Sequence, residues 1–105
     1  MTRRYSAKVD RNQSEIVAAL RDVGATVQPL HSVGAGCPDL LVGYRGRNFL
    51  IEVKDWQAPT SDRKLNDRQV EWHGGWKGQV AKVETVGAAL AVIGVYDLHM
   101  RGDIA

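Results

Sequence analysis

The spacing of apolar residues along the first part of the chain follows a helical pattern. Apolar side chains recur every three or four positions between Ile16 and Val23, as on one face of an amphipathic helix. Asp10 or Asn12 can cap this helix, because a short polar side chain accepts a hydrogen bond from the first backbone amides. Gly24 is a natural stop for it. The pattern therefore predicts a helix ahead of the first strand.

Strand-like segments come next. Residues 25–30 contain threonine and valine and are interrupted near their end by a proline, which predicts a short strand. Residues 32–38 contain two glycines and form a loop. Residues 39–44 and 48–54 are apolar runs of strand length, and only three residues, one of them a glycine, separate them. This spacing predicts a tight antiparallel hairpin.

A loop and a second helix follow the hairpin. Residues 55–62 include a proline and several small polar residues, so we expect a loop there. The next segment predicts a helix that begins at Asn66 or Asp67 and ends at Gly74 or runs to Gly78.

A last strand and a last helix complete the pattern. Residues 79–83 alternate like a strand, and Thr85 can cap an apolar helix over residues 86–93. The order of elements, αβββαβα, implies an α/β domain with a mixed sheet flanked by helices. Because 105 residues suffice for one core only, we expect residues 1–105 to form a single domain.

Composition narrows the class of protein. A hydrophobic fraction of 44% and a charged fraction of 25% are typical of soluble globular domains. The apolar runs are too short to span a bilayer and no signal-peptide pattern opens the chain, so we expect a cytoplasmic protein without a membrane segment. Cys37, the only cysteine, receives no role, and His31 and His73 lack the spacing of metal ligands. A net charge of +2 permits nucleic-acid binding without demonstrating it.

Two charged residues end the second strand of the hairpin. Strand alternation places Glu52 and Lys54 on one face, where an otherwise apolar strand emerges into a cleft or into solvent. Such a pair alone is usually a solvated ion pair of little energetic value. Asp39 changes the interpretation, because antiparallel pairing brings the start of one strand beside the end of the other. Two carboxylates at such close range repel unless a cation or a proton lies between them.

A divalent cation fits this pair of carboxylates. Mg²⁺ prefers hard oxygen ligands, so it would bind Asp39, Glu52 and the backbone carbonyl of Val53, and Mn²⁺ could substitute for it. The cation would bridge these residues to a scissile phosphate. Lys54 could orient or help deprotonate the attacking water and offset the charge of the transition state. Together these residues indicate phosphodiester hydrolysis.

The residues that carry this chemistry resemble a known family. Cys37-Pro38-Asp39, a spacer of strand, turn and strand, and Glu52-Val53-Lys54 resemble the motif of the PD-(D/E)XK nucleases, which have a restriction-endonuclease-like core. More narrowly, residues 36–40 and 51–54 resemble the VRR-NUC (virus-type replication-repair nuclease) domain. Further matching positions are Leu65, Gln69, Trp72 and the strand that begins at Gly78. The resemblance covers about residues 14–93.

The resemblance implies two more catalytic residues. Glu15 on the first helix matches an additional acidic residue of the family and a possible metal ligand, and Gln69 matches a glutamine that lines the site. Glu15 can equally be an acid that the helix dipole favours in a first turn. Gln69 lies in the apolar stripe of Leu65, Trp72 and Trp76, so it faces inward. There it either lines the site or is a core-edge amide bonded to backbone.

Basic residues form three groups that could hold DNA phosphates around the metal. They lie near the N-terminus, at the hairpin turn and after the loop that follows the strand of Lys54: Arg3, Arg4, Lys8 and Arg11; Arg45 and Arg47; Arg63, Lys64 and Arg68. Each group can also be an ordinary solvated charge cluster, since aspartates lie among them. No base-reading motif is present, so we expect recognition of DNA shape.

The resemblance also implies a function. Family members that stand alone look like homodimers acting on four-way junctions, so we expect a metal-dependent, structure-selective DNA endonuclease similar to a Holliday-junction resolvase. We place it in phage or prophage DNA replication or repair, inside a bacterial or phage-infected host cell. Candidates for the dimer surface are Trp56, Trp72, Trp76 and the helix at residues 86–93. Two alternatives are a catalytically idle nucleic-acid-binding module with the same fold, and a scaffold in which Glu52 and Lys54 simply pair.

Overall fold

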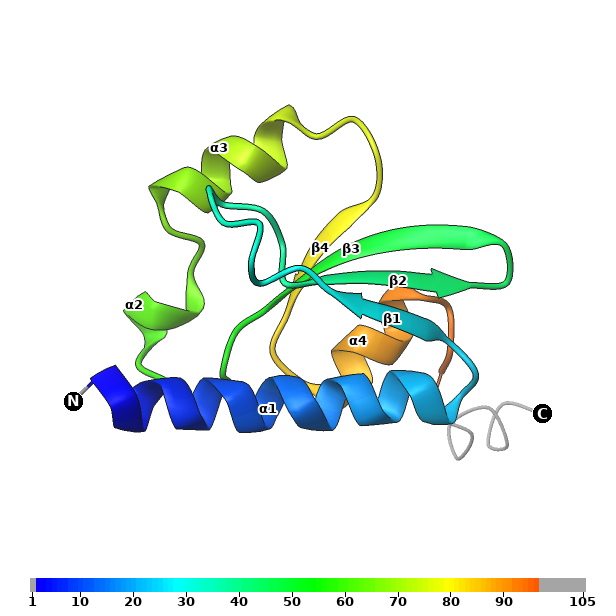
Figure 1. Cartoon of the computed structure of the whole chain (residues 1–105), viewed down its shortest axis with the longest axis horizontal. Coiled ribbons are helices and arrows are strands. Elements are labelled where there is room, and N and C mark those ends of the chain that lie inside the picture. Colours follow the sequence, from blue (N-terminus) through cyan, green and yellow to red (C-terminus); the bar gives the residue numbers. More distant parts are fainter. Residues whose placement is uncertain (1, 97–105) are drawn as a thin grey trace.

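The computed structural model describes the backbone of residues 2–96 and the side chains of residues 11–96. Figure 1 shows its helices and strands, which in chain order are α1 (Thr2–Asp22), β1 (Thr26–Pro29), β2 (Leu40–Tyr44), β3 (Arg47–Val53), α2 (Thr60–Arg63), α3 (Asp67–Gly75), β4 (Val80–Val83) and α4 (Val86–Val92).

The four strands form one mixed sheet in the order β1-β2-β3-β4. β1 pairs with β2 and β2 with β3 in antiparallel fashion, whereas β3 and β4 run parallel. The predicted hairpin is confirmed, with Leu40 opposite Ile51 at its open end and Tyr44 opposite Arg47 at its turn. The α/β class, the mixed sheet and the element order are therefore as the sequence predicts, apart from one additional short helix.

Two helices cover one face of the sheet and a third lies on the other side (Figure 1). α1 and α4 pack together with Leu40, Val42 and Ile51, all fully buried, in the apolar core. Neighbouring strand residues point to opposite faces, so Leu41 is 37% exposed on the side of α3.

The first helix begins earlier than predicted. Its first residue is Thr2, so the prediction that Asp10 or Asn12 caps it is wrong. Residues 2–11 contain neither proline nor glycine, and nothing in them stops the helix. The Asn12 side chain instead donates to the backbone carbonyls of Lys54, at 3.0 Å, and of Glu84, at 3.3 Å. A residue suited to a helix cap here joins α1 to the ends of β3 and β4.

The remaining helices begin close to their predicted positions. Asn66 caps α3 and Thr85 caps α4, each accepting a hydrogen bond from a backbone amide three residues later. The loop predicted at residues 55–62 contains the start of the short helix α2, which follows Pro59. Pro59 stands at the N-cap of α2 without a side-chain cap, so no ordinary capping signal marks this four-residue helix in the sequence. In the described part of the chain, no helix has the length and apolar character needed to cross a lipid bilayer.

Candidate active site

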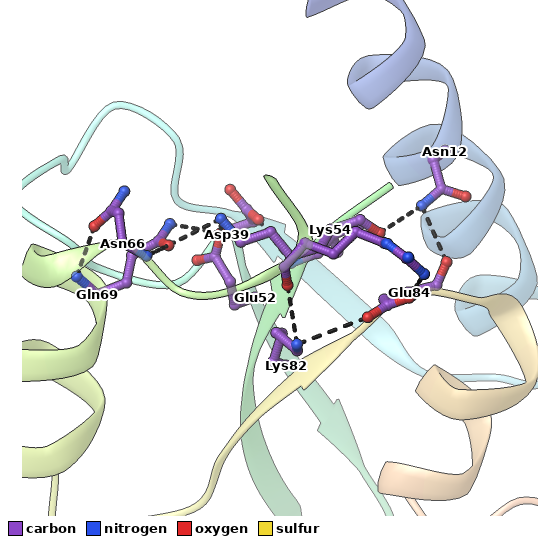
Figure 2. A network of polar contacts seen from close by, with 10 residues as sticks. Asn12, Asp39, Glu52, Lys54, Asn66, Gln69, Lys82 and Glu84 are labelled. Carbon is purple, nitrogen blue, oxygen red and sulfur yellow. Dashed lines mark hydrogen bonds and ion pairs between the residues drawn. The ribbon is translucent and has the colours of Figure 1, made fainter. Parts of the chain in front are cut away.

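The candidate site lies where β2 begins and β3 ends. Asp39 directly precedes β2, and its Oδ2 accepts a hydrogen bond of 2.8 Å from the backbone N–H of Val53, the last residue of β3. The carboxylate thus takes the place of a strand partner beyond the end of the β2 ladder. Because the N–H and C=O of one strand residue point to the same side, the Val53 carbonyl also faces the Asp39 side. Figure 2 shows Asp39 beside Glu52 and Lys54.

Glu52 is nearly inaccessible to solvent, with 4% of its surface exposed. Its Oε2 accepts a hydrogen bond of 2.9 Å from Gln69 Nε2 and lies 4.0 Å from Lys54 Nζ. Its Oε1 is buried and has no hydrogen-bond partner among the described residues. A buried acceptor without a partner is destabilising, so this oxygen calls for a proton or a cation.

The surroundings of Glu52 favour its neutral form. Burial and the nearby Asp39 carboxylate raise the pKa of Glu52 from its ordinary 4.5 to about 8, although Lys54 and Gln69 oppose the shift. Two carboxyl groups at such short range cannot both ionise without a positive charge between them. In the protein alone, Glu52 is therefore mainly protonated at neutral pH.

Gln69 links Glu52, in β3, to Lys54, which directly follows β3. Its Nε2 donates to Glu52, and its Oε1 accepts a hydrogen bond of 2.9 Å from Lys54 Nζ. The Lys54 side chain is only 15% exposed, so its ammonium group is held in a mostly buried position. The structure thus brings Asp39, Glu52, Lys54 and Gln69 together from the start of β2, the end of β3 and the helix α3. Gln69 contacts the charged pair, and its helix places it across from the end of β3.

Glu15 is not part of this cluster. It is exposed on α1 and lines a separate cavity with Arg11, Asp55 and Trp56. α1 packs through Ile16, the next residue, so Glu15 is turned about 100° away from the buried stripe. Among the described residues, no group of three or more histidine, cysteine, aspartate or glutamate side chains could hold a metal. The structure therefore does not group Glu15 with Asp39 and Glu52, and its role as a possible metal ligand stays a prediction.

The hairpin arginines do not lie around the site. Arg47 precedes Glu52 by five strand residues, which corresponds to ~17 Å. The guanidinium groups of Arg45 and Arg47 lie over the rings of Tyr44 and Phe49, at 5.2 and 5.6 Å from the ring centres. The antiparallel ladder places the turn at the far end of β3, so these arginines lie away from Asp39 and Glu52, and their contact with DNA phosphates stays a prediction.

The other predicted DNA contacts have different surroundings. Arg63 lies 3.5 Å from the Glu84 carboxylate, which offsets much of its charge. Lys64 is exposed at the end of α2, and Arg68 is exposed on α3, the helix that carries Gln69. Arg11 is exposed on α1. The side chains of Arg3, Arg4 and Lys8 lie outside the described residues.

His73, His31 and Cys37, to which the sequence assigns no role, lie in different surroundings. His73 is half-buried on α3, and burial together with the nearby Lys54 ammonium lowers its pKa. His31 is exposed and lines a cavity that Asp39 also lines, next to α1. Burial, followed by the charges of Glu52 and Asp39, raises the pKa of the Cys37 thiol, so it remains protonated.

Comparison with known proteins gives one structural likeness. No family model matches the sequence, and no curated protein matches it. A solved structure described as a VRR_NUC domain has a TM-score of 0.65 and 26% sequence identity, over 86% of this chain and 98% of that chain. This match supports a VRR-NUC domain. It agrees with the resemblance carried by Asp39, Glu52 and Lys54, and the VRR-NUC fold indicates a nuclease-type domain.

The pKa of Glu52 predicts how stability depends on pH in the absence of metal. The folded state holds the proton up to about pH 8, whereas the unfolded chain loses it near 4.5. The free energy of unfolding should therefore fall as pH rises between these values and level off above them. Glu52→Gln has no such proton, so in EDTA it should gain a few kcal/mol over wild type between about pH 5 and about pH 8.5.

Urea unfolding of both proteins at several pH values measures this difference. Glu71→Gln, which removes an exposed carboxylate from α3, is the matched control and should follow wild type at every pH. Parallel stability curves for wild type and Glu52→Gln would contradict the assignment of Glu52 as a buried, protonated group.

Proposed function

We propose that this domain is a metal-dependent endonuclease that hydrolyses phosphodiester bonds in branched DNA, in the manner of a Holliday-junction resolvase. The observation that carries the proposal is the buried Glu52 carboxyl, with its unpartnered Oε1, beside Asp39 and Lys54 at a strand end. The likeness to a VRR_NUC domain supports the nuclease part. We place its action in phage or prophage DNA replication or repair, in the cytoplasm of a bacterial or phage-infected cell.

The donor set fits a hard divalent cation. Asp39 and Glu52 offer carboxylate oxygens, Val53 offers a backbone carbonyl on the same side, and Glu52 Oε1 lacks a partner among the described residues. Mg²⁺ selects such oxygens, and Mn²⁺ accepts them too. A bound cation supplies Lewis-acid activation of the phosphate and of water, and it removes the repulsion between the two carboxylates.

The protein's own groups supply the rest of the chemistry. The Lys54 ammonium, held by Gln69 at 2.9 Å, is placed to orient the attacking water and to stabilise negative charge that develops on the phosphate. Gln69 also fixes Glu52 Oε2, so the carboxylate cannot rotate away from the ligand set. Burial of Glu52 excludes bulk water and strengthens each of these electrostatic interactions.

An apolar cavity beside the site supports the proposed homodimer. It lies between the loop after β1, the hairpin and α3, and its walls include Val33, Leu41, Leu50, Trp72 and Trp76. Val33 is 61% exposed and Trp76 is 46% exposed. The rings of Trp72 and Trp76 stack, with their centroids 4.7 Å apart. Large exposed apolar residues that gather around one cavity are typical of interfaces. We propose that a second copy of the chain covers this surface, which would suit the two-fold symmetry of a four-way junction.

The final helix is not available for that role. Ala89 of α4 and Ile93, the residue that ends it, are 1% and 5% exposed, and both belong to the core with α1. Of the candidate dimer surfaces, α4 is therefore not favoured, because its apolar face packs in the core. Trp56 is 53% exposed but lies on the other cavity, with Glu15.

Cleavage assays test the proposed activity. Labelled four-way junction and linear duplex of matched sequence are incubated with the protein in Mg²⁺, Mn²⁺ or EDTA. We expect metal-dependent cuts in the junction, and a loss of rate on the order of 100-fold or more for Glu52→Gln and for Lys54→Ala. Glu71→Gln and Lys77→Ala, both at exposed positions, are the controls and should cut like wild type.

Each other outcome changes the conclusion. Equal cutting of duplex would leave a nuclease without junction selectivity. Junction binding without any product, in every metal, would contradict the nuclease and favour the idle binding module. Full activity of Lys54→Ala would remove the catalytic role of that lysine.

Sedimentation or light scattering tests the dimer. Trp76→Glu introduces a charge into the apolar surface, so we expect a monomer where wild type is a dimer. Trp56→Glu changes a tryptophan of similar exposure on the other cavity and should remain dimeric. A monomeric wild-type protein, or loss of the dimer only in Trp56→Glu, would contradict the proposed surface.

A further inference from the structure

The Gln69 side chain takes part in two sets of hydrogen bonds, those of the α3 cap and those of the charged pair Glu52 and Lys54. Asn66 caps α3, and its side-chain oxygen accepts a hydrogen bond of 2.9 Å from the Gln69 backbone N–H. In return, the Asn66 backbone N–H donates to Gln69 Oε1 at 3.0 Å, which completes a reciprocal capping box. The same amide binds Glu52 and Lys54, so the helix cap and the charged pair share one group (Figure 2).

This sharing determines which way the amide faces. Gln69 Oε1 accepts from two donors, Asn66 N and Lys54 Nζ, and Gln69 Nε2 donates to the Glu52 carboxyl. If the amide turned over, its NH₂ group would face both donors and its oxygen would face Glu52 Oε2. The Asn66 N–H opposes that rotation with a donor fixed in the backbone, whereas Lys54 has a long and rotatable side chain.

We propose that Asn66 is a positioning residue of the active site, acting on Glu52 and Lys54 through the Gln69 amide. Asn66 touches neither of the two charged residues by a hydrogen bond of its own; its contacts are with Gln69. The role in catalysis rests on the proposed nuclease function. The orientation of Gln69 does not, and it can be measured without any DNA.

A series of substitutions at residue 66 separates the two hydrogen bonds. Serine can accept from the Gln69 N–H and keeps the backbone donor. Alanine keeps only the backbone donor. Proline removes both, and the φ of −76° at Asn66 is close to the value that proline requires. The effect on the Gln69 amide should therefore grow from serine to alanine to proline.

The other capped helix supplies a matched control. Thr85 caps α4 with a hydrogen bond of 3.1 Å from Ala88 N, and α4 lies on the opposite face of the sheet from Gln69. Thr85→Ala should lower stability to a degree similar to Asn66→Ala, since both remove one helix cap. It leaves the contacts of Gln69, Glu52 and Lys54 unchanged, so it reports what loss of a cap does by itself.

The first readout is the single-turnover cleavage rate at saturating protein, which separates chemistry from DNA binding. We expect a rate within roughly twofold of wild type for Asn66→Ser, a several-fold loss for Asn66→Ala and a loss on the order of 10- to 100-fold for Asn66→Pro. Junction affinity should stay unchanged throughout, and Thr85→Ala should cut like wild type. Equal rates for Asn66→Pro and Thr85→Ala, at equal stability, would overturn the proposal.

The second readout is hydrogen exchange of the Gln69 side-chain NH₂, followed by NMR in EDTA and assigned with Gln69→Ala. The protons facing Glu52 should exchange slowly in wild type, Asn66→Ser and Thr85→Ala, and faster in Asn66→Ala and fastest in Asn66→Pro. Unchanged protection in the alanine and proline variants would overturn the positioning role. If Asn66→Pro fails to fold, the serine and alanine variants carry the comparison. If wild type cuts no DNA, the proposed function fails, and the exchange data alone decide whether Asn66 positions Gln69.

Discussion

The buried carboxyl of Glu52, beside Asp39 at the end of β3, is the constraint on which the rest of the site depends. A 4% exposed carboxyl with one unpartnered oxygen is unfavourable unless it holds a proton or meets a cation. In the protein alone, the pKa of Glu52 is raised to about 8, so the carboxyl keeps its proton at neutral pH. A divalent cation would instead be bound by the two carboxylates and the Val53 carbonyl. The same burial that destabilises the charged form would favour the divalent cation that we propose for this site.

The fold holds this constraint in place from three directions. The hairpin register brings Asp39 to the last residue of β3, where it binds the Val53 N–H. From one face, Asn12 of α1 binds the carbonyl of Lys54 and that of Glu84. From the other face, Gln69 of α3 binds the Glu52 carboxyl and the Lys54 ammonium. Backbone and side chain of Lys54 are therefore fixed by different helices.

Much of this arrangement follows from local sequence. Period-two alternation and a short turn predict the hairpin, and the hairpin alone places Asp39 near Glu52. The spacing of three between Asn66 and Gln69 is a capping-box signature, and it could have indicated that Asn66 also matters.

The remaining differences depend on tertiary contacts that periodicity does not contain. The role of Asn12 is set by carbonyls 42 and 72 residues away along the chain, so its local cap preference misled the prediction. The direction of the Glu15 side chain depends on how α1 is rotated against the sheet. Burial of its neighbour Ile16 fixes that rotation. Arg47 was grouped with the site because basic residues attract DNA phosphates, but it lies at the other end of β3 from Glu52.

Calorimetric titration of the purified protein with Mn²⁺ tests the central claim most directly. If Asp39 and Glu52 form a cation site, wild type and Glu71→Gln should bind Mn²⁺ alike, while Asp39→Asn and Glu52→Gln should each lose most of the affinity. Binding that survives in both of those variants, or no binding by wild type, would contradict the account.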